Sequence, residues 1–247
     1  MRYPRLTAVF ALLLMLPSQP LWGAGLKVAP VSISLDADHS IEVIQIENSG
    51  ASPTRVQLRL FAWEQRSGQD ELNPTRDVLA NPAQFEMAPG GTQTVRIGRL
   101  IPPGDVEKSY RLLIEEIPSA AAVNTQQVKM LLRISIPVFV PPVTPETDLR
   151  WRAVASDGRQ LTLWVENRGS SHVQLRRISV ASQGSGTAVG EHGQMLYVLP
   201  GATRVVSLST ASPVRAGQAL VVSATTDGAS IAASMVTEAT PHADPAD

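Results

Sequence analysis

Histidine is the residue type that most often carries metal or acid–base chemistry, and this chain has four of them and no cysteine. They lie far apart in the sequence, at His39, His172, His192 and His242, and none has the short spacing of a metal-ligand pair. We interpret them as scattered surface or loop residues. The sequence therefore predicts neither a metal site nor a cofactor.

Two further patterns in the sequence do not indicate a catalytic site. Glu115 and Glu116 are adjacent in a strand-like run, so their carboxylates should face opposite sides and cannot work as a pair. Gly184-Ser185-Gly186, followed by Gly190, faintly resembles a phosphate-binding loop, but no helix follows it, and we predict a flexible loop between strands. No nucleophile or metalloprotease motif occurs. We expect a protein that is not an enzyme.

Two arginines inside apolar strands are more informative. Arg111 lies in Tyr110-Arg111-Leu112, and Arg133 lies between Leu132 and Ile134. Each could be a salt-bridged or edge-protecting residue of a strand. Each could equally be a fork that holds the carboxylate of a partner, which arginine does in bidentate fashion.

A long alternating run positions the second of these arginines. Large aliphatic residues occupy every second position from 128 to 136, namely Val128, Met130, Leu132, Ile134 and Ile136. This two-residue period predicts a strand from Val128 to Val140 with all five side chains on one face, ended by Pro141-Pro142. The row could be ordinary core. It could also be an edge that lends side chains and backbone to another protein.

The N-terminus has the pattern of a secretory signal. Arg2 and Arg5 precede a short apolar stretch centred on residues 12–16, and small residues follow at 23–25. We expect cleavage after Ala24 or Gly25, export to the periplasm and no membrane insertion. Without cysteines, the exported protein must be held together by its core alone. A formal net charge of −1 argues against a nucleic-acid partner.

Short strand-like runs separated by turn residues fill the rest of the chain, and no long segment has a helical period. The runs predicted in the first block are 27–35, 41–47, 55–63, 84–87, 93–99, 109–117 and 128–140. Those in the second block are 149–155, 160–166, 173–181, 195–199, 203–208, 219–225 and 231–237. The pattern predicts an all-β protein with an immunoglobulin-like domain over 26–142, a smaller β domain over 146–237 and a disordered tail over 238–247.

These features together resemble the periplasmic pilus (fimbrial) chaperones of chaperone–usher systems. The resemblance covers about residues 26–237. It is carried by Asn81-Pro82-Ala83-Gln84-Phe85, by residues 89–97, by Ser109-Tyr110-Arg111-Leu112 and by Glu116-Ile117-Pro118, followed by the alternating strand at the family's spacing. The run Arg133-Ile134-Ser135-Ile136-Pro137 is more similar to the divergent, archaic-type branch.

The resemblance implies two immunoglobulin-like domains arranged as a boomerang, with pilin subunits and an outer-membrane usher as partners. The last strand of the first domain would fill the groove of an incomplete pilin, with Val128, Met130, Leu132 and Ile134 at the donor positions. The family's basic pair for the pilin C-terminal carboxylate is not matched, because Ser135 occupies one position and only Lys27 is available on the first strand. We therefore expect Arg111 and Arg133, with Lys27 as the third candidate, to hold the carboxylate. Asp227 matches the family's acidic residue between the domains.

Two other classes of protein fit the sequence less well. A secreted structural or adhesive sandwich, such as a pilin, is disfavoured because pilins of this kind are single incomplete domains. A metal-dependent enzyme on a sandwich, such as a dismutase, is disfavoured by the absence of a histidine cluster.

Overall fold

The computed structural model describes residues 25–118, 131–156, 159–226 and 228–239. Every regular element in these segments is a β-strand, as the all-β prediction required. Within them there is no helix long and apolar enough to cross a membrane.

The first domain contains two packed sheets. Its strands are β1 (Leu26–Ala29), β2 (Ile33–Ser34), β3 (Ile41–Asn48), β4 (Thr54–Arg66), β5 (Gln69–Pro74), β6 (Val78–Asn81), β7 (Gln84–Met87), β8 (Thr92–Arg99), β9 (Lys108–Ile117) and β10 (Arg133–Val140). One sheet has the order β1-β3-β8-β6. The other has the order β2-β10-β9-β4-β5, with β7 also paired to β4.

The core of the first domain lies between these sheets. Alternate residues of each strand point inward, for example Ile44 and Ile46 on β3 and Leu112 and Ile114 on β9, and all four are fully buried. Because the strand period is two, the intervening residues of β4, β9 and β10 face outward. That outward face of the second sheet carries the charged residues described below.

The second domain is a separate set of sheets. Its strands are β11 (Leu149–Ser156), β12 (Gln160–Asn167), β13 (Val173–Leu175), β14 (Arg177–Ser182), β15 (Ala188–His192), β16 (Leu196–Val198), β17 (Thr203–Ser209), β18 (Ala219–Thr225) and β19 (Ser230–Ala239). The larger sheet has the order β15-β14-β18-β19-β11-β12-β17, and β13 pairs with β16. Its own core is built on Leu161, Leu163, Ile178 and Val222.

Three differences from the predicted strands have physical reasons. The run 27–35 divides into β1 and β2, which pair with different sheets on either side of Pro30, a residue that cannot donate to a ladder. Strand β15 includes Gly190, so the glycine-rich region predicted as a loop is a turn at Gly184 and Gly186 followed by a strand. Strand β19 continues through Glu238 and Ala239, which the sequence assigned to the disordered tail.

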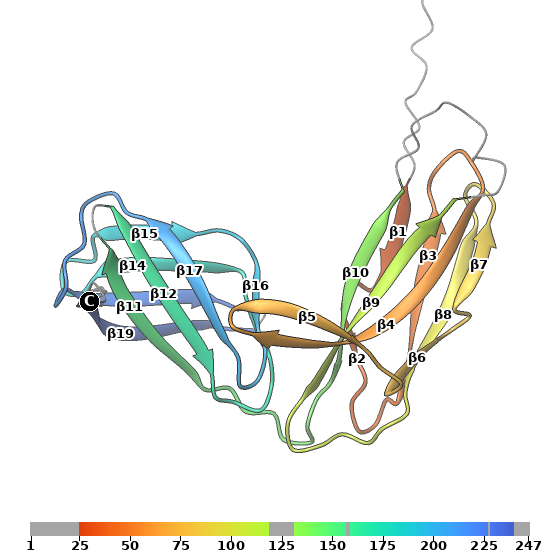
Figure 1. Ribbon diagram of the computed structural model, residues 1–247, viewed down its shortest axis with the longest axis horizontal. Coiled ribbons are helices and arrows are strands. Elements are labelled where there is room, and N and C mark those ends of the chain that lie inside the picture. Colours follow the sequence, from red (N-terminus) through yellow and green to blue (C-terminus); the bar gives the residue numbers. More distant parts are fainter. Residues whose placement is uncertain (1–24, 119–130, 157–158, 227, 240–247) are drawn as a thin grey trace, which may run out of the picture.

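The two domains form the arms of a boomerang, joined where β10 leads into β11 (Figure 1). The β4–β5 hairpin extends beyond the first sandwich toward the second domain (Figure 1). The second sheet of the first domain, with β4, β9 and β10, lies on the side of its arm that faces the other arm.

In each domain, the side chain of a buried asparagine holds a turn by hydrogen bonds to the backbone. The Asn167 amide donates to the carbonyls of Ser171 (2.8 Å) and Val198 (2.9 Å), and its oxygen accepts from the Gly169 N–H (2.9 Å). Asn48 makes the corresponding bonds in the first domain, to the Ser52 carbonyl (2.8 Å) and from the Gly50 N–H (3.0 Å). The same side chain therefore closes the same kind of turn in both domains.

Asn167→Ala is expected to lower the free energy of unfolding by about 2–3 kcal/mol, because it leaves buried carbonyls and an N–H without partners. Urea denaturation of the purified protein measures this. The control is Arg168→Ala at the exposed neighbouring position, where a surface ion pair with Glu166 is lost and the change should stay within about 0.5 kcal/mol. Equal midpoints for the two variants would contradict the role of the asparagine.

Candidate binding surface and domain joint

Strand β10 has an open backbone edge over most of its length. On one side it pairs with β9 from Arg133 to Val140. On the other side, in the part of the chain that the structure describes, β2 pairs only with Val138 and Phe139, and the Leu35 N–H donates to the Phe139 carbonyl (2.8 Å). Residues 131–137 therefore present an edge to which an extended chain can add.

The aliphatic row along β10 is buried in the domain core at the C-terminal end of the strand and becomes partly exposed toward its N-terminal end. Ile136 and Val138 are 1 % and 0 % exposed and belong to the core. Ile134 is partly exposed and packs at the margin of that core, and Leu132 is also partly exposed. The row is therefore core at the base of the strand and incompletely covered above it. That the upper part is lent to another protein stays a prediction. Val128 and Met130 lie outside the described residues.

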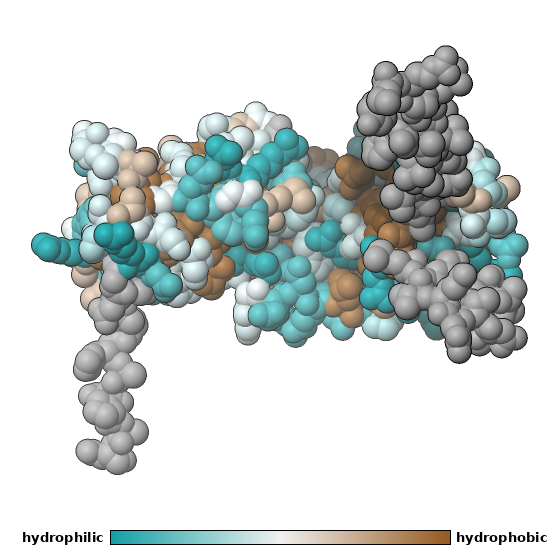
Figure 2. Space-filling view, turned by 90° about the horizontal axis from the view of Figure 1, so that it is seen from above, coloured by the Kyte–Doolittle hydropathy of each residue, from teal (hydrophilic) through white to brown (hydrophobic). Residues whose placement is uncertain are grey.

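Apolar surface is visible where the row emerges. Seen from above, brown surface gathers on the first domain next to the segments drawn in grey (Figure 2). Leu131, which precedes β10, is 43 % exposed. The open edge is thus accompanied by apolar side chains, which is the combination that strand addition requires.

A charged cluster crosses the outward face of the same sheet. The Glu115 carboxylate on β9 forms ion pairs with two arginines. Arg59 on β4 donates from Nε to Oε2 (2.7 Å), and Nη2 of Arg133 on β10 lies 2.6 Å from Oε1. Glu115 is buried, whereas Arg133 is 66 % exposed. Glu116 is the next residue on β9, so its side chain lies on the other face of the sheet, as the alternation predicted; it is buried, and its carboxylate accepts from the Leu132 N–H (3.5 Å). Arg133 is therefore the salt-bridged residue of a strand that one interpretation anticipated.

Arg111 has a different environment. It lies on the same outward face, opposite Phe61 on β4 and Pro137 on β10. Its guanidinium carbon stands 3.6 Å from the centre of the Trp63 ring and 5.4 Å from that of Tyr197 in the second domain. Desolvation lowers the pKa of Arg111, opposed by the nearby charges of Asp70 and Tyr197. No ion pair or hydrogen bond of its guanidinium is found among the described residues.

The two arginines predicted to act together, and Lys27 as the further candidate, are not brought to one point. Arg133 pairs with Glu115, four residues along β9 from Arg111, so the two backbone positions are separated by about 13 Å at the rise of an extended strand. Lys27 lies on β1 in the other sheet, where its ammonium is paired with Glu47 (3.0 Å) and is 68 % exposed. Only Arg111 lies beside the second domain.

An aromatic cluster holds the two domains together. Trp63 on β4 and Phe139 on β10 pack with Leu199 and Ala202 of the second domain, and Tyr197 adds to the cluster. Tyr197 meets Trp63 edge to face, with ring centres 5.4 Å apart and planes at 80°. Phe139 is stacked on the His172 ring at 3.6 Å. The base of β10 is therefore fixed directly against the second domain.

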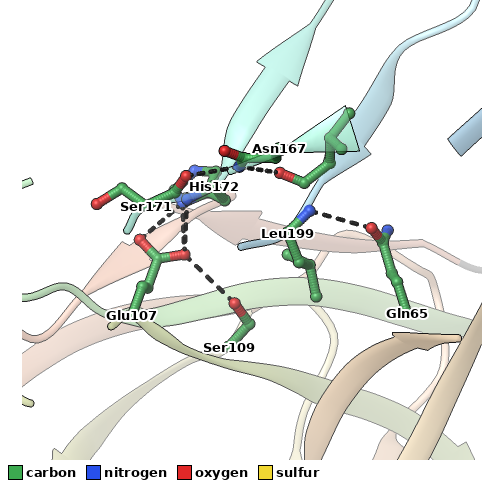
Figure 3. Close-up of polar contacts among 8 residues, drawn as sticks. Gln65, Glu107, Ser109, Asn167, Ser171, His172 and Leu199 are labelled. Atoms are coloured by element: carbon green, nitrogen blue, oxygen red, sulfur yellow. Dashed lines mark hydrogen bonds and ion pairs between the residues drawn. The ribbon is translucent and has the colours of Figure 1, made fainter. Parts of the chain in front are cut away.

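Two polar bridges flank this cluster (Figure 3). The His172 ring lies with Nδ1 2.8 and 2.9 Å from the carboxylate oxygens of Glu107, which also accepts from the His172 N–H (3.2 Å) and the Ser109 hydroxyl (3.3 Å). On the other flank, Gln65 accepts from the Leu199 N–H (3.0 Å). Both bridges join side chains of the first domain to the backbone or ring of the second.

The β4–β5 hairpin makes a further contact across the joint. The Arg204 guanidinium of β17 donates to the Gly68 carbonyl (2.8 Å) and to the Asp70 carboxylate (3.1 Å). The Gln65 amide donates to the same Asp70 oxygen (3.0 Å) and to the Tyr197 carbonyl (3.1 Å). Asp70 is thus occupied by groups other than Arg111.

Sequence reasoning missed most residues of the joint. His172 was interpreted as a scattered surface or loop residue, but it lies at this joint, and neither Glu107, Gln65 nor Arg204 was singled out. Arg59, between Leu58 and Leu60, carries the same signal of a basic residue inside an apolar strand and could have been found by it. Asp227, the residue predicted to lie between the domains, falls outside the described residues.

The described residues contain no group of three or more histidines and carboxylates that could hold a metal ion. The described residues form two immunoglobulin-like domains, and in the first of them the edge of β10 is open over residues 131–137. Residues 25–146 match the family model described as pili and flagellar-assembly chaperone, PapD N-terminal domain. The chain belongs to this family of pilus chaperones, which confirms the resemblance seen in the sequence.

Solved structures of pilus chaperones share the fold at low sequence identity. One is from the CsuC–CsuE chaperone–tip adhesion subunit pre-assembly complex of archaic chaperone–usher Csu pili of Acinetobacter baumannii, with 20 % identity and a TM-score of 0.61 over 88 % of this chain and 100 % of that one. A second is from the complex of the Salmonella enterica SafA pilin with the SafB chaperone, with 20 % identity and a TM-score of 0.57 over 86 % and 96 %. A third is the Pseudomonas aeruginosa CupB2 chaperone, with 16 % identity and a TM-score of 0.54 over 85 % and 100 %. A search of curated protein sequences gave no significant match.

Proposed function

We propose that this protein is a periplasmic chaperone that binds incomplete pilin subunits by donor-strand complementation and delivers them to an outer-membrane usher. The observation that carries the proposal is the edge of β10, open over residues 131–137 and lined by an aliphatic row that leaves the core at Ile134. A pilin that lacks one strand exposes a groove of apolar side chains and unpaired backbone, which is an aggregation hazard. An added strand supplies both missing parts at once. The family consists of assembly chaperones, and we propose that this member acts by binding alone.

The direct test is co-expression with a pilin subunit from the same genome. A soluble one-to-one complex in the periplasmic extract, with free pilin degraded or aggregated when the chaperone is omitted, is the expected result. Recovery of this chain in the purified surface fibre would instead favour a structural or adhesive role.

Arg111 is proposed as the main anchor for the pilin C-terminal carboxylate, with Arg133 contributing less because Glu115 already binds it. Arg111→Ala should reduce pilin capture about tenfold or more, the usual effect of losing a charge-assisted bond in a desolvated site. Arg133→Ala should have a smaller effect, and Lys27→Ala, on the other sheet, is the matched control. Affinity for the co-expressed pilin, measured on the folded variants, ranks the three. Wild-type capture by Arg111→Ala would place the anchor elsewhere.

Export with cleavage of a signal is proposed from the charged start and the short apolar stretch. The donor strand and domains proposed over 26–142 and 146–237 would then form the mature protein. The Gly25 carbonyl accepts from the Ser49 N–H (2.9 Å), so cleavage after Ala24 keeps a bond of the folded domain that cleavage after Gly25 removes. Mass spectrometry of the periplasmic protein should find a first residue of Gly25 or Leu26. A full-length chain in the cytoplasm or membrane would refute export.

A further inference from the structure

The Arg111 guanidinium lies over aromatic rings, and its N–H groups have no hydrogen-bond partner in the part of the chain that the structure describes. Trp63 covers it at 3.6 Å from the ring centre, and Tyr197 lies at 5.4 Å. Guanidinium N–H groups donate only in the plane of the group, so stacking on a ring leaves them available to a planar acceptor such as a carboxylate. Within the described residues no such acceptor is bound to them.

The carboxylate whose charge acts on Arg111 is engaged by the second domain. Desolvation lowers the pKa of Arg111, and the charge of Asp70 opposes this effect. Asp70 itself accepts from the Arg204 guanidinium (3.1 Å) and from the Gln65 amide (3.0 Å). Arg204 also donates to the Gly68 carbonyl (2.8 Å), which fixes the hairpin that carries Asp70. Among the described residues, Arg111 therefore has no ion-pair partner, and Asp70, whose charge acts on it, is bound by Arg204.

Tyr197 is fixed from several sides. Its hydroxyl accepts from the Gln174 amide (2.8 Å), and its carbonyl accepts from the Gln65 amide (3.1 Å). Its ring stands edge to face against Trp63. One wall around Arg111 therefore belongs to β16 of the second domain and keeps its place only while the joint is closed.

We propose that the carboxylate site of this chaperone is completed by its second domain, with Tyr197 positioning the Arg111 guanidinium and Arg204 keeping Asp70 from neutralising it. The proposal rests on the proposed function of Arg111 as the anchor and adds the regulation of that site by the domain joint. Binding of a carboxylate and closure of the joint then favour each other, because coupling between two sites is reciprocal. Tyr197 and Arg204 are positioning residues that act through Arg111.

The probe is a strand-length peptide of alternating valine and threonine with a free C-terminal carboxylate, compared with the same peptide ending in an amide. Fluorescence anisotropy gives both dissociation constants for the full mature chain. The ratio of the two affinities isolates recognition of the carboxylate, because general damage to the strand edge weakens both peptides alike. The Nε–Hε signal of Arg111 in an arginine-labelled sample should shift with the carboxylate peptide only.

Tyr197→Leu is expected to lower this ratio about fivefold, the scale of a cation–π contact that is still open to solvent, while Tyr197→Phe should retain most of it. Arg204→Gln should lower the ratio as well, by releasing Asp70 toward Arg111. Adding Asp70→Asn to Arg204→Gln should restore it, which a purely structural role of Arg204 would not produce. Melting curves show whether each variant is folded at the temperature of measurement.

Arg111→Ala separates the failure of this inference from the failure of the anchor itself. If Arg111→Ala leaves the ratio unchanged, Arg111 is not the anchor and the inference falls with it. If Arg111→Ala brings the ratio to one but Tyr197→Leu and Arg204→Gln keep the wild-type value, the anchor stands and the role of the second domain is overturned.

Discussion

Replacing Met130 and Leu132 together with threonine is expected to lower the affinity for a pilin by about 100-fold or more, while the free chaperone melts within a few degrees of the wild type. Threonine keeps the preference for a strand but removes the apolar side chain that would enter the pilin groove. Leu132 is partly exposed and precedes β10, so little of the chaperone's own core is lost. The expectation for Met130, outside the described residues, rests on its place in the alternating row.

Ile136→Thr is the matched control for that double variant. It makes the same kind of change on the same face of the same strand, but Ile136 is 1 % exposed and lies in the core with Val138 and Val140. The change should cost about 2–5 kcal/mol of folding stability, because it opens a cavity and buries a hydroxyl. Thermal melting and pilin co-purification, measured on the double variant and on Ile136→Thr, distinguish residues that enter the pilin groove from residues of the chaperone's own core. A large drop in the melting temperature of the free Met130/Leu132 variant would sink the donor-strand interpretation.

The strands that the sequence predicted are those whose alternation is imposed by a core. The alternation of Val56 and Leu58, or of Leu161 and Leu163, is visible in the sequence because each pair is fully or almost fully buried. Strand β5, whose residues are all exposed, has no such alternation and is specified by its pairing with β4. Strand β6 has the sequence Val-Leu-Ala-Asn, in which three apolar residues follow one another, so it has no alternation to recognise.

The same distinction applies to the candidate binding site, where some residues could be predicted from the sequence and their partners could not. Arg111 and Arg133 were found because a basic residue in an apolar strand is conspicuous in the sequence. Their different environments were not predictable, because Glu115 and Tyr197 are brought to them by pairing and by the second domain. Likewise, Glu107 and His172 are 65 residues apart in the chain, and nothing local in either segment indicates that they meet.

Glu107→Ala is expected to be among the most destabilising changes at the joint. The Glu107 side chain is 2 % exposed and accepts from the His172 ring, the His172 N–H and the Ser109 hydroxyl. Removing it leaves the buried Ser109 hydroxyl and the partly buried His172 groups without this acceptor. Since each unpaired buried polar group costs about 1–3 kcal/mol, the free energy of unfolding should fall by about 3 kcal/mol.

The consequence reaches beyond stability, because the His172 ring that Glu107 holds is stacked on Phe139 at the base of β10. Small-angle scattering should therefore show a larger radius of gyration for Glu107→Ala, because the joint loosens. Urea denaturation should show that this variant unfolds at a lower urea concentration than the wild type. Glu107→Gln keeps the volume and one acceptor oxygen and should lose about half as much. Glu238→Ala, which removes the exposed ion pair with Arg152, is the surface control and should change stability by no more than about 0.5 kcal/mol. If Glu107→Ala and Glu238→Ala unfold at the same urea concentration, the buried bridge does not hold the domains together, and the aromatic cluster around Trp63 must do so with the Gln65 and Arg204 contacts.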